Sequence, residues 1–150
     1  MPKTDEVQKL ILDLFTSQNL AVLCTHREGQ PYASLIAFLA SDDLKNIFFV
    51  TPKTTRKFAN LSVDSRVALL INSSTNDVSD FHQAVSVTVV GRAAEISGPD
   101  RTEILNQYLG RHPHLEEFAK SPTCALVGIA AKSYYLVKNF QRVMELHINE

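Results

Sequence analysis

The chain has 150 residues, of which 45% are hydrophobic and 21% charged, enough to build one globular domain over residues 1–150. Lysine plus arginine number 15 and aspartate plus glutamate 16, and this net charge of −1 argues against nucleic-acid binding through a broad basic surface. No run approaches the roughly 20 apolar residues that span a bilayer. The N-terminus shows no signal-peptide pattern, and the two cysteines form no C-x-x-C pair. We therefore expect a cytoplasmic protein that does not associate with membranes.

The first half of the chain predicts a helix followed by strands that are linked by hairpins. Apolar residues recur at helical spacing between Val7 and Phe15, and the apolar run over residues 20–25 is typical of a buried strand. Turn residues at 27–31 and 41–43 separate further strands over 32–39 and 47–51. Residues 54–61 then predict a short helix and residues 66–71 a fourth strand.

The second half predicts more strands and two further helical segments. Residues 72–80 form a polar loop, and residues 85–96 form a strand in which Gly91 indicates a bend or bulge. A helix follows Pro99, a short segment covers 115–120, and two last strands cover 125–130 and 133–139. Six or seven short strands with helices between them favour a small, closed or partly closed, mainly antiparallel β-barrel. The sequence contains neither G-x-G-x-x-G nor G-x-x-x-x-G-K-[ST].

The stretch after the third predicted strand carries groups suited to a phosphate. A helix N-terminus presents free backbone N–H groups, and Thr54 or Thr55 adds a hydroxyl close to it. Arg56 contributes a planar fork of donors and Lys57 a compact ammonium group. The alternative is a capped surface helix with two solvated cations.

In its wider context, this stretch resembles the FMN-binding split β-barrel family typified by pyridoxamine 5′-phosphate oxidases. A T-x-x-x-S-R-K stretch follows the third strand in that family and binds the FMN phosphate, and its counterpart here is TPKTTRK at residues 51–57. The family's V-x-V-x-G-x-A strand has its counterpart at residues 87–93. The resemblance covers residues 20–96 and implies a six- to seven-stranded antiparallel split β-barrel.

The resemblance also implies which residues bind the cofactor FMN. They are Ala33, Ser34 and Leu35 against the flavin ring, Val50 and Thr51 at its polar edge, Thr55, Arg56 and Lys57 at the phosphate, and Ser86 as a further polar contact. The register that places Ser86 is open by a residue or two. Ser34 and Ser86 could instead be plain strand residues, and Val50 could belong to the core.

The function that the resemblance implies is an FMN-dependent oxidoreductase. Family members are homodimers with flavin between the subunits, and Tyr134, Tyr135 and Leu136 are our candidates for the subunit contact. Pyridoxamine phosphate is a doubtful substrate, because oxidases acting on it carry a tryptophan and an Arg-x-His pair near the C-terminus. This chain has no tryptophan, and residues 141–147 read QRVMELH.

The rival hypothesis is a module that binds flavin or haem without catalysis. His82 or His147 could then serve as a haem ligand, since some proteins with this barrel are similar to haem-degrading proteins. His112 and His114 flank Pro113, which favours a rigid surface turn, and we expect no metal site. A deazaflavin in place of FMN also remains open.

Overall fold

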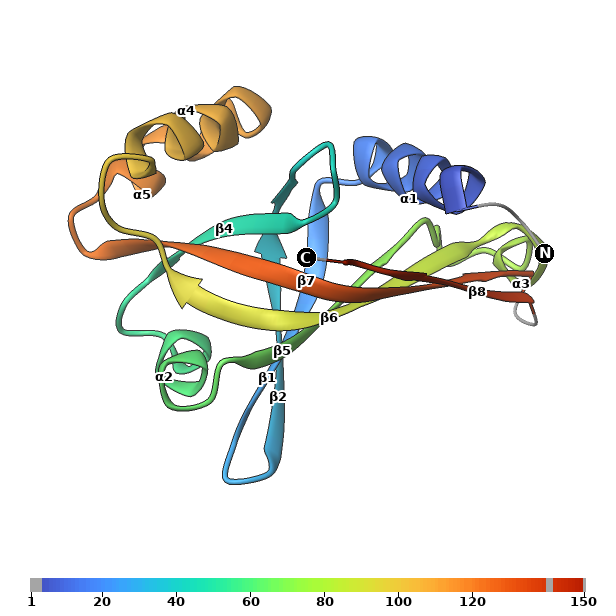
Figure 1. The fold of residues 1–150 in the computed structure, drawn as a ribbon, viewed down its shortest axis with the longest axis horizontal. Coiled ribbons are helices and arrows are strands. Elements are labelled where there is room, and N and C mark those ends of the chain that lie inside the picture. The colour runs from blue at the N-terminus through green and yellow to red at the C-terminus, as the bar shows by residue number, and fades with distance from the viewer. Residues whose placement is uncertain (1–3, 140–141, 150) are drawn as a thin grey trace.

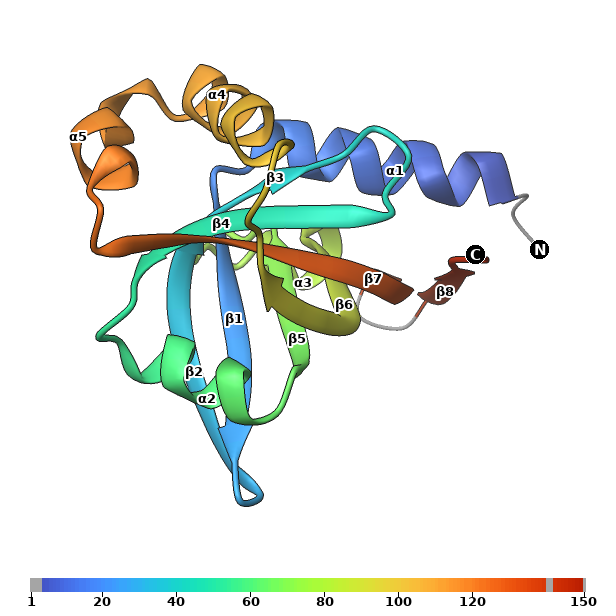
Figure 2. The same ribbon diagram turned by 60° about the vertical axis from the view of Figure 1, so that its left-hand side comes forward.

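The computed structural model describes residues 4–139 and 142–149, and its centre is an antiparallel sheet curled into a half-barrel (Figures 1 and 2). The strands are β1 (Leu20–Arg27), β2 (Gln30–Ala37), β3 (Leu39–Ala40), β4 (Asn46–Pro52), β5 (Arg66–Asn72), β6 (Val85–Glu95), β7 (Cys124–Lys138) and β8 (Arg142–His147). The helices are α1 (Thr4–Ser17), α2 (Arg56–Val63), α3 (Asp80–Gln83), α4 (Arg101–Arg111), η1 (Pro113–Leu115) and α5 (Glu116–Lys120). This architecture confirms the predicted split-barrel fold class. No helix among the described residues is long and apolar enough to cross a membrane.

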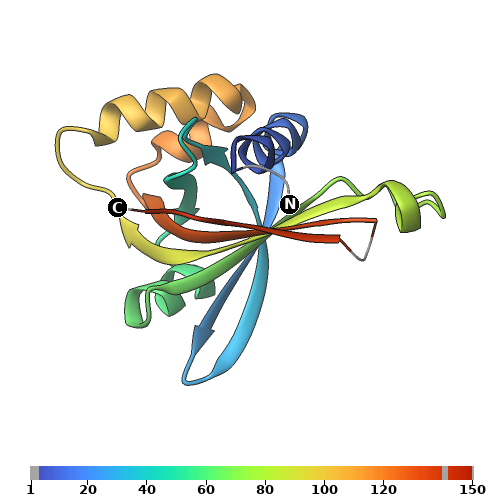
Figure 3. The same cartoon turned by 45° about the vertical axis from the view of Figure 1, so that its right-hand side comes forward.

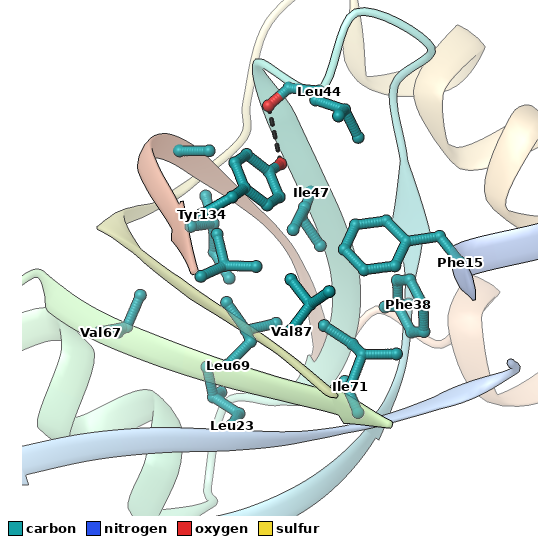
Figure 4. Close-up of a cluster of buried hydrophobic side chains, with 14 of the residues drawn as sticks. Phe15, Leu23, Phe38, Leu44, Ile47, Val67, Leu69, Ile71, Val87 and Tyr134 are labelled. Carbon is teal, nitrogen blue, oxygen red and sulfur yellow. Dashed lines mark hydrogen bonds between the residues drawn. The ribbon is translucent and has the colours of Figure 1, made fainter. Parts of the chain in front are cut away.

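The core fills the concave face of the sheet. Its strands run in the order β2-β1-β5-β6-β7-β4-β3, and β8 pairs with β7. Leu23, Leu69, Val89 and Tyr134 lie opposite one another on four neighbouring strands, and all four are buried. Figure 4 shows Tyr134 reaching across this core to Leu44, whose carbonyl oxygen accepts a hydrogen bond from the tyrosine hydroxyl at 2.7 Å. Side chains thus alternate between core and outer face, as in any sheet with one buried side.

Helix α1 closes one side of this core and confirms the first predicted helix. Its apolar residues recur at helical spacing, so one face of the helix is buried. The ring of Phe15 packs edge-on against Phe38, with 5.4 Å between the ring centroids (Figure 4). The buried residues of the helix are Val7, Ile11, Leu14 and Phe15.

Gly91 lies at a β-bulge, as its place in the sequence predicts. The register between β6 and β7 shifts between Val90 and Gly91. A Cβ atom at Gly91 would lie only 2.3 Å from the carbonyl oxygen of Ala130, so no larger residue fits while the strands stay in place. The glycine therefore permits the close approach at which the sheet bends.

The barrel is split between β2 and β4. β3 pairs with β4, whereas β2, only one residue upstream, pairs with β1 alone among the described strands. Helices α4 and α5 lie beyond β4, where Figure 2 shows them covering that side of the sheet. A second apolar cluster joins them to it and consists of Val50, Leu105, Tyr108, Ala119, Cys124 and Leu126.

Two predictions for the C-terminal third are wrong. The expected strands at 125–130 and 133–139 are one strand, β7, because Lys132 is the extra residue of the bulge: Ala131 pairs with Gly91 and Ser133 with Val90, so the strand continues past it. The sequence assigned no element to residues 142–147, yet they form β8 along β7.

The expected subunit contact is also partly wrong. Tyr134 and Leu136 are 0% exposed and belong to the core, so neither can touch a second subunit. Tyr135 between them faces outward and is half-buried. Because neighbouring residues of a strand point to opposite faces, three consecutive residues cannot share one contact.

Candidate functional site

Helix α2 is held at one end of the half-barrel, against β1 and β2 (Figure 2). Thr55 is its N-cap, and the hydroxyl of Thr55 accepts a hydrogen bond from the Phe58 N–H at 3.3 Å. The hydroxyl oxygens of Thr51 and Thr55 lie 2.9 Å apart, so the end of β4 is tied to the start of the helix. Further along, the Asn60 amide donates to the Thr25 hydroxyl at 3.1 Å, and both groups are buried. These bonds fix the position of the helix N-terminus.

A pocket of about 800 Å³ lies between this helix and the β1–β2 hairpin. Arg56 places its guanidinium over the ring of Tyr32, 5.4 Å from the ring centroid. Among the described residues, no carboxylate forms an ion pair with Arg56. A guanidinium that stacks on an aromatic ring and keeps its donors available is well suited to bind an anion. The lining residues are Arg27, Glu28, Gln30, Pro31, Tyr32, Thr54, Thr55, Arg56, Ala59 and Asn60.

Lys57 differs from its neighbour Arg56. It is half-buried and does not line the pocket, although it follows Arg56 directly in the helix. Burial lowers the pKa of the Lys57 ammonium, because removal from water disfavours the charged form. Of the three residues predicted to bind the phosphate, Thr55 and Arg56 therefore line the pocket, whereas Lys57 lies beside it.

The three predicted residues on β2 face two different sides. Ala33 and Leu35 pair with Cys24 and Val22 on the outer face, where Leu35 is 62% exposed. Ser34 pairs with the core residue Leu23 and faces inward. Its hydroxyl oxygen is buried and has no hydrogen-bond partner among the described residues. A buried hydroxyl without a partner is rare and can be satisfied by a bound molecule.

Val50 belongs to the core by its side chain. It packs in the second apolar cluster, and its backbone N–H is close enough to the Tyr108 hydroxyl to act on the pKa of that phenol. Only the backbone of Val50 could therefore meet a ligand. The structure confirms the alternative that the sequence left open for this side chain.

Ser86 lies away from the other predicted site residues. It is near the start of β6, opposite Asn72 at the end of β5, whereas α2 precedes the start of β5. Figures 1 and 3 show α2 and the α3 end of these strands on opposite sides of the molecule. The length of β5 corresponds to about 20 Å. Ser86 instead lines a separate pocket of about 530 Å³ together with Asn72 and Phe81.

Sequence reasoning missed Arg27, Tyr32 and Asn60 as pocket residues. Arg27 and Tyr32 flank the hairpin turn, and their place beside α2 follows only from how the hairpin folds against that helix. The alternation of β2 could have shown that Tyr32 and Ser34 share a face. No local pattern relates Asn60 to Thr25.

The histidines form no metal site in the part of the chain that the structure describes. His112 is buried, with its Nε2 2.7 Å from the Phe38 carbonyl oxygen, so it serves the fold and forms no chelating pair with His114. His147 contacts Ser133 and Glu145 at 2.8 and 3.1 Å. His82 is exposed on α3.

Several solved structures share this fold at low sequence identity. A haem-binding protein from Mycobacterium smegmatis is 17% identical with a TM-score of 0.82, and the match covers 98% of this chain and 59% of that one. ChuZ from Campylobacter jejuni is 15% identical with a TM-score of 0.81, over 98% of this chain and 61% of that one. General stress protein 26 from Bacillus anthracis is 17% identical with a TM-score of 0.72, over 93% and 98%. The chain thus spans about three fifths of the first two proteins.

The sequence itself identifies the family. No curated protein sequence matches the chain. The sequence profile described as pyridoxamine 5′-phosphate oxidase matches residues 6–138, which include the pocket beside α2 and all strands from β1 to β7. The chain therefore belongs to the pyridoxamine 5′-phosphate oxidase family.

Proposed function

We propose that residues 1–150 form one FMN-binding domain that acts as a flavin-dependent oxidoreductase. The observation that carries the proposal is the Arg56 guanidinium, which lies over Tyr32 and beside the N-cap Thr55 without a carboxylate partner in the described residues. A phosphate dianion at this place would accept hydrogen bonds from the guanidinium and gain from the positive end of α2. Membership of the pyridoxamine 5′-phosphate oxidase family supports the proposal that this phosphate belongs to a bound flavin.

The residues near the split suit the rest of a flavin. On the inward face of β2, the unpartnered hydroxyl of Ser34 offers a donor and an acceptor, and Ala33 and Leu35 offer apolar surface on the opposite face. Among the strands that the structure describes, none pairs with β2 on the side away from β1. When bound, the flavin supplies the electron transfer, so the protein needs only to bind and orient it and its substrate.

Purified protein mixed with FMN tests this proposal. We expect an oxidised-flavin absorption spectrum that stays with the protein on gel filtration, and quenching of the free FMN fluorescence. A colourless protein that leaves FMN free would refute flavin binding. A Soret band after incubation with haemin would favour the haem-binding alternative, in line with the haem-binding relative from Mycobacterium smegmatis. Oxidation of a reduced nicotinamide by the FMN-loaded protein distinguishes an enzyme from a binding module.

We also propose that the protein is a homodimer with flavin between the subunits. Ser86 is too far from Arg56 within one chain to share a flavin with it, so a shared site requires a second copy. The outer face of the sheet carries apolar residues that a partner would cover, among them Leu35, Leu70 and Val143 at 62%, 38% and 59% exposure. Exposed apolar groups on one sheet face are typical of an interface.

Light scattering of the FMN-loaded protein should give twice the chain mass of 16.7 kDa. Replacing Leu70 and Val143 by aspartate should give monomers, because charges on this face would be buried without partners. The matched control is Val63→Asp, an exposed apolar residue on α2 at 65% exposure, which should remain dimeric. Monomers of the unmodified protein at micromolar concentration with flavin bound would contradict the dimer.

A further inference from the structure

The hydrogen-bond ladder between β3 and β4 stops abruptly at the split. Leu39 lies opposite Phe48, and two positions further along the ladder the Ser41 N–H donates to the Asn46 carbonyl at 2.9 Å. Hydrogen-bonded pairs recur at every second position of an antiparallel ladder. The next such pair in this register would be Ala37 with Val50. The chain does not form it, because β2 pairs with β1 alone among the described strands.

The hydroxyl of Tyr108 takes the place of that missing pair. It donates to the Ala37 carbonyl oxygen at 3.0 Å, and the backbone N–H of Val50 is close enough to the phenol oxygen to act against the rise in the pKa of Tyr108. A phenol has one donor and free acceptor capacity, so one oxygen can face both backbone groups. Burial raises the pKa of Tyr108 to about 12, so the hydroxyl keeps its proton at neutral pH. One oxygen from α4 therefore bonds the Ala37 carbonyl and lies beside the Val50 N–H, the two backbone groups that a continued ladder would have joined.

Tyr108 is held firmly in this position. Its side chain is 1% exposed within the second apolar cluster, and its ring lies 5.0 Å from that of His112, measured between centroids. His112 in turn lies within hydrogen-bonding distance of the Phe38 carbonyl, and Arg111 donates to the Phe15 carbonyl at 2.6 Å. The end of α4 is thus anchored both on the segment where β2 passes into β3 and on the end of α1.

We propose that Tyr108 is a positioning residue whose hydroxyl keeps β2 and β4 apart and so sets the width of the split. A direct ladder bond would bring the Val50 nitrogen to about 2.9 Å from the Ala37 oxygen, whereas an interposed hydroxyl holds them roughly 5 Å apart. If the ladder continued, the next pair would bring Thr51 opposite Ile36 at ordinary strand spacing and close the space beside Ser34. The part of this proposal that concerns FMN rests on the proposed function.

The experiment compares Tyr108→Phe with Tyr134→Phe. Both variants keep a buried ring and lose a hydroxyl that donates to a backbone carbonyl, but the Tyr134 hydroxyl bonds Leu44, away from the split. We expect similar losses of stability in urea. FMN affinity should fall about tenfold in Tyr108→Phe, the worth of one or two hydrogen bonds, and stay within about twofold in Tyr134→Phe.

A second measurement does not depend on FMN. Hydrogen exchange of the Val50 amide should accelerate in FMN-free Tyr108→Phe and remain as in the unmodified protein in Tyr134→Phe. Equal FMN affinity in the two variants, with the Val50 amide still protected, would overturn the proposal. If the unmodified protein binds no FMN, the proposed function fails. The hydrogen-exchange rate of the Val50 amide then tests the role of Tyr108 by itself. Should Tyr108→Phe not fold, His112→Phe tests the same anchor, and unchanged FMN affinity and Val50 exchange in it would refute the proposal.

Discussion

Replacing Arg56 by alanine is expected to weaken FMN binding about 10- to 150-fold and to change riboflavin binding by no more than about twofold. A hydrogen bond to a charged group contributes about 1.5–3 kcal/mol, which corresponds to that range of affinity. Arg56 carries the effect because it lines the pocket and, in the described chain, no carboxylate competes for its guanidinium. Riboflavin lacks the phosphate, so it provides the internal comparison. Calorimetric titration of both ligands measures the difference.

The matched control for this prediction is Arg66→Ala. Arg66 is also exposed, but its guanidinium donates to Asp64 at 2.7 Å and does not line the pocket beside α2. FMN affinity should therefore be unchanged in Arg66→Ala. Lys57→Ala should weaken FMN binding less than Arg56→Ala, because an ammonium lacks the bidentate fork. If a folded Arg56→Ala, Lys57→Ala double variant binds FMN normally, the phosphate assignment is wrong and α2 is a capped surface helix.

Replacing Gly91 by alanine is expected to destabilise the fold by about 1–3 kcal/mol or more. The added Cβ would lie 2.3 Å from the Ala130 carbonyl oxygen and 3.1 Å from its carbonyl carbon. Both are backbone atoms of the neighbouring strand β7, so rotation of a side chain cannot relieve the clash. β6 and β7 would have to separate at the bulge. Urea denaturation followed by circular dichroism measures the loss.

Gly110→Ala is the matched control for the Gly91 substitution. Gly110 lies in α4, and a Cβ there would meet nothing within 4 Å. Alanine in a helix is favoured over glycine by roughly 0.5–1 kcal/mol, so this variant should be more stable. A Gly91→Ala protein within about 0.5 kcal/mol of the unmodified one would show that the bulge tolerates a side chain.

Local patterns in the sequence determined most of the elements. The helical spacing that ends at Phe15, the alternation before Gly91 and the turn residues at 27–31 each depend on contacts between near neighbours in the chain. Such contacts can be predicted without knowledge of the fold, and the structure has a helix, a bulged strand and a hairpin at these three places. The start of α2 could be predicted for the same reason, because Thr55 caps the helix through a contact with its own first turn.

The tertiary structure alone decided which of these residues meet. Tyr32 reaches Arg56 only because the hairpin folds beside α2, and Ser86 is kept from Arg56 by the length of β5. The hydroxyl of Tyr108 meets Ala37 across 71 positions of the chain, a separation that no local spacing encodes. Whether Tyr134 faces the core or a partner depended on the register of β7 against β6, because a shift by one residue exchanges the two faces of a strand. Pairing between distant segments is chosen by the packing of the whole core, and so the sequence read locally could not reveal it.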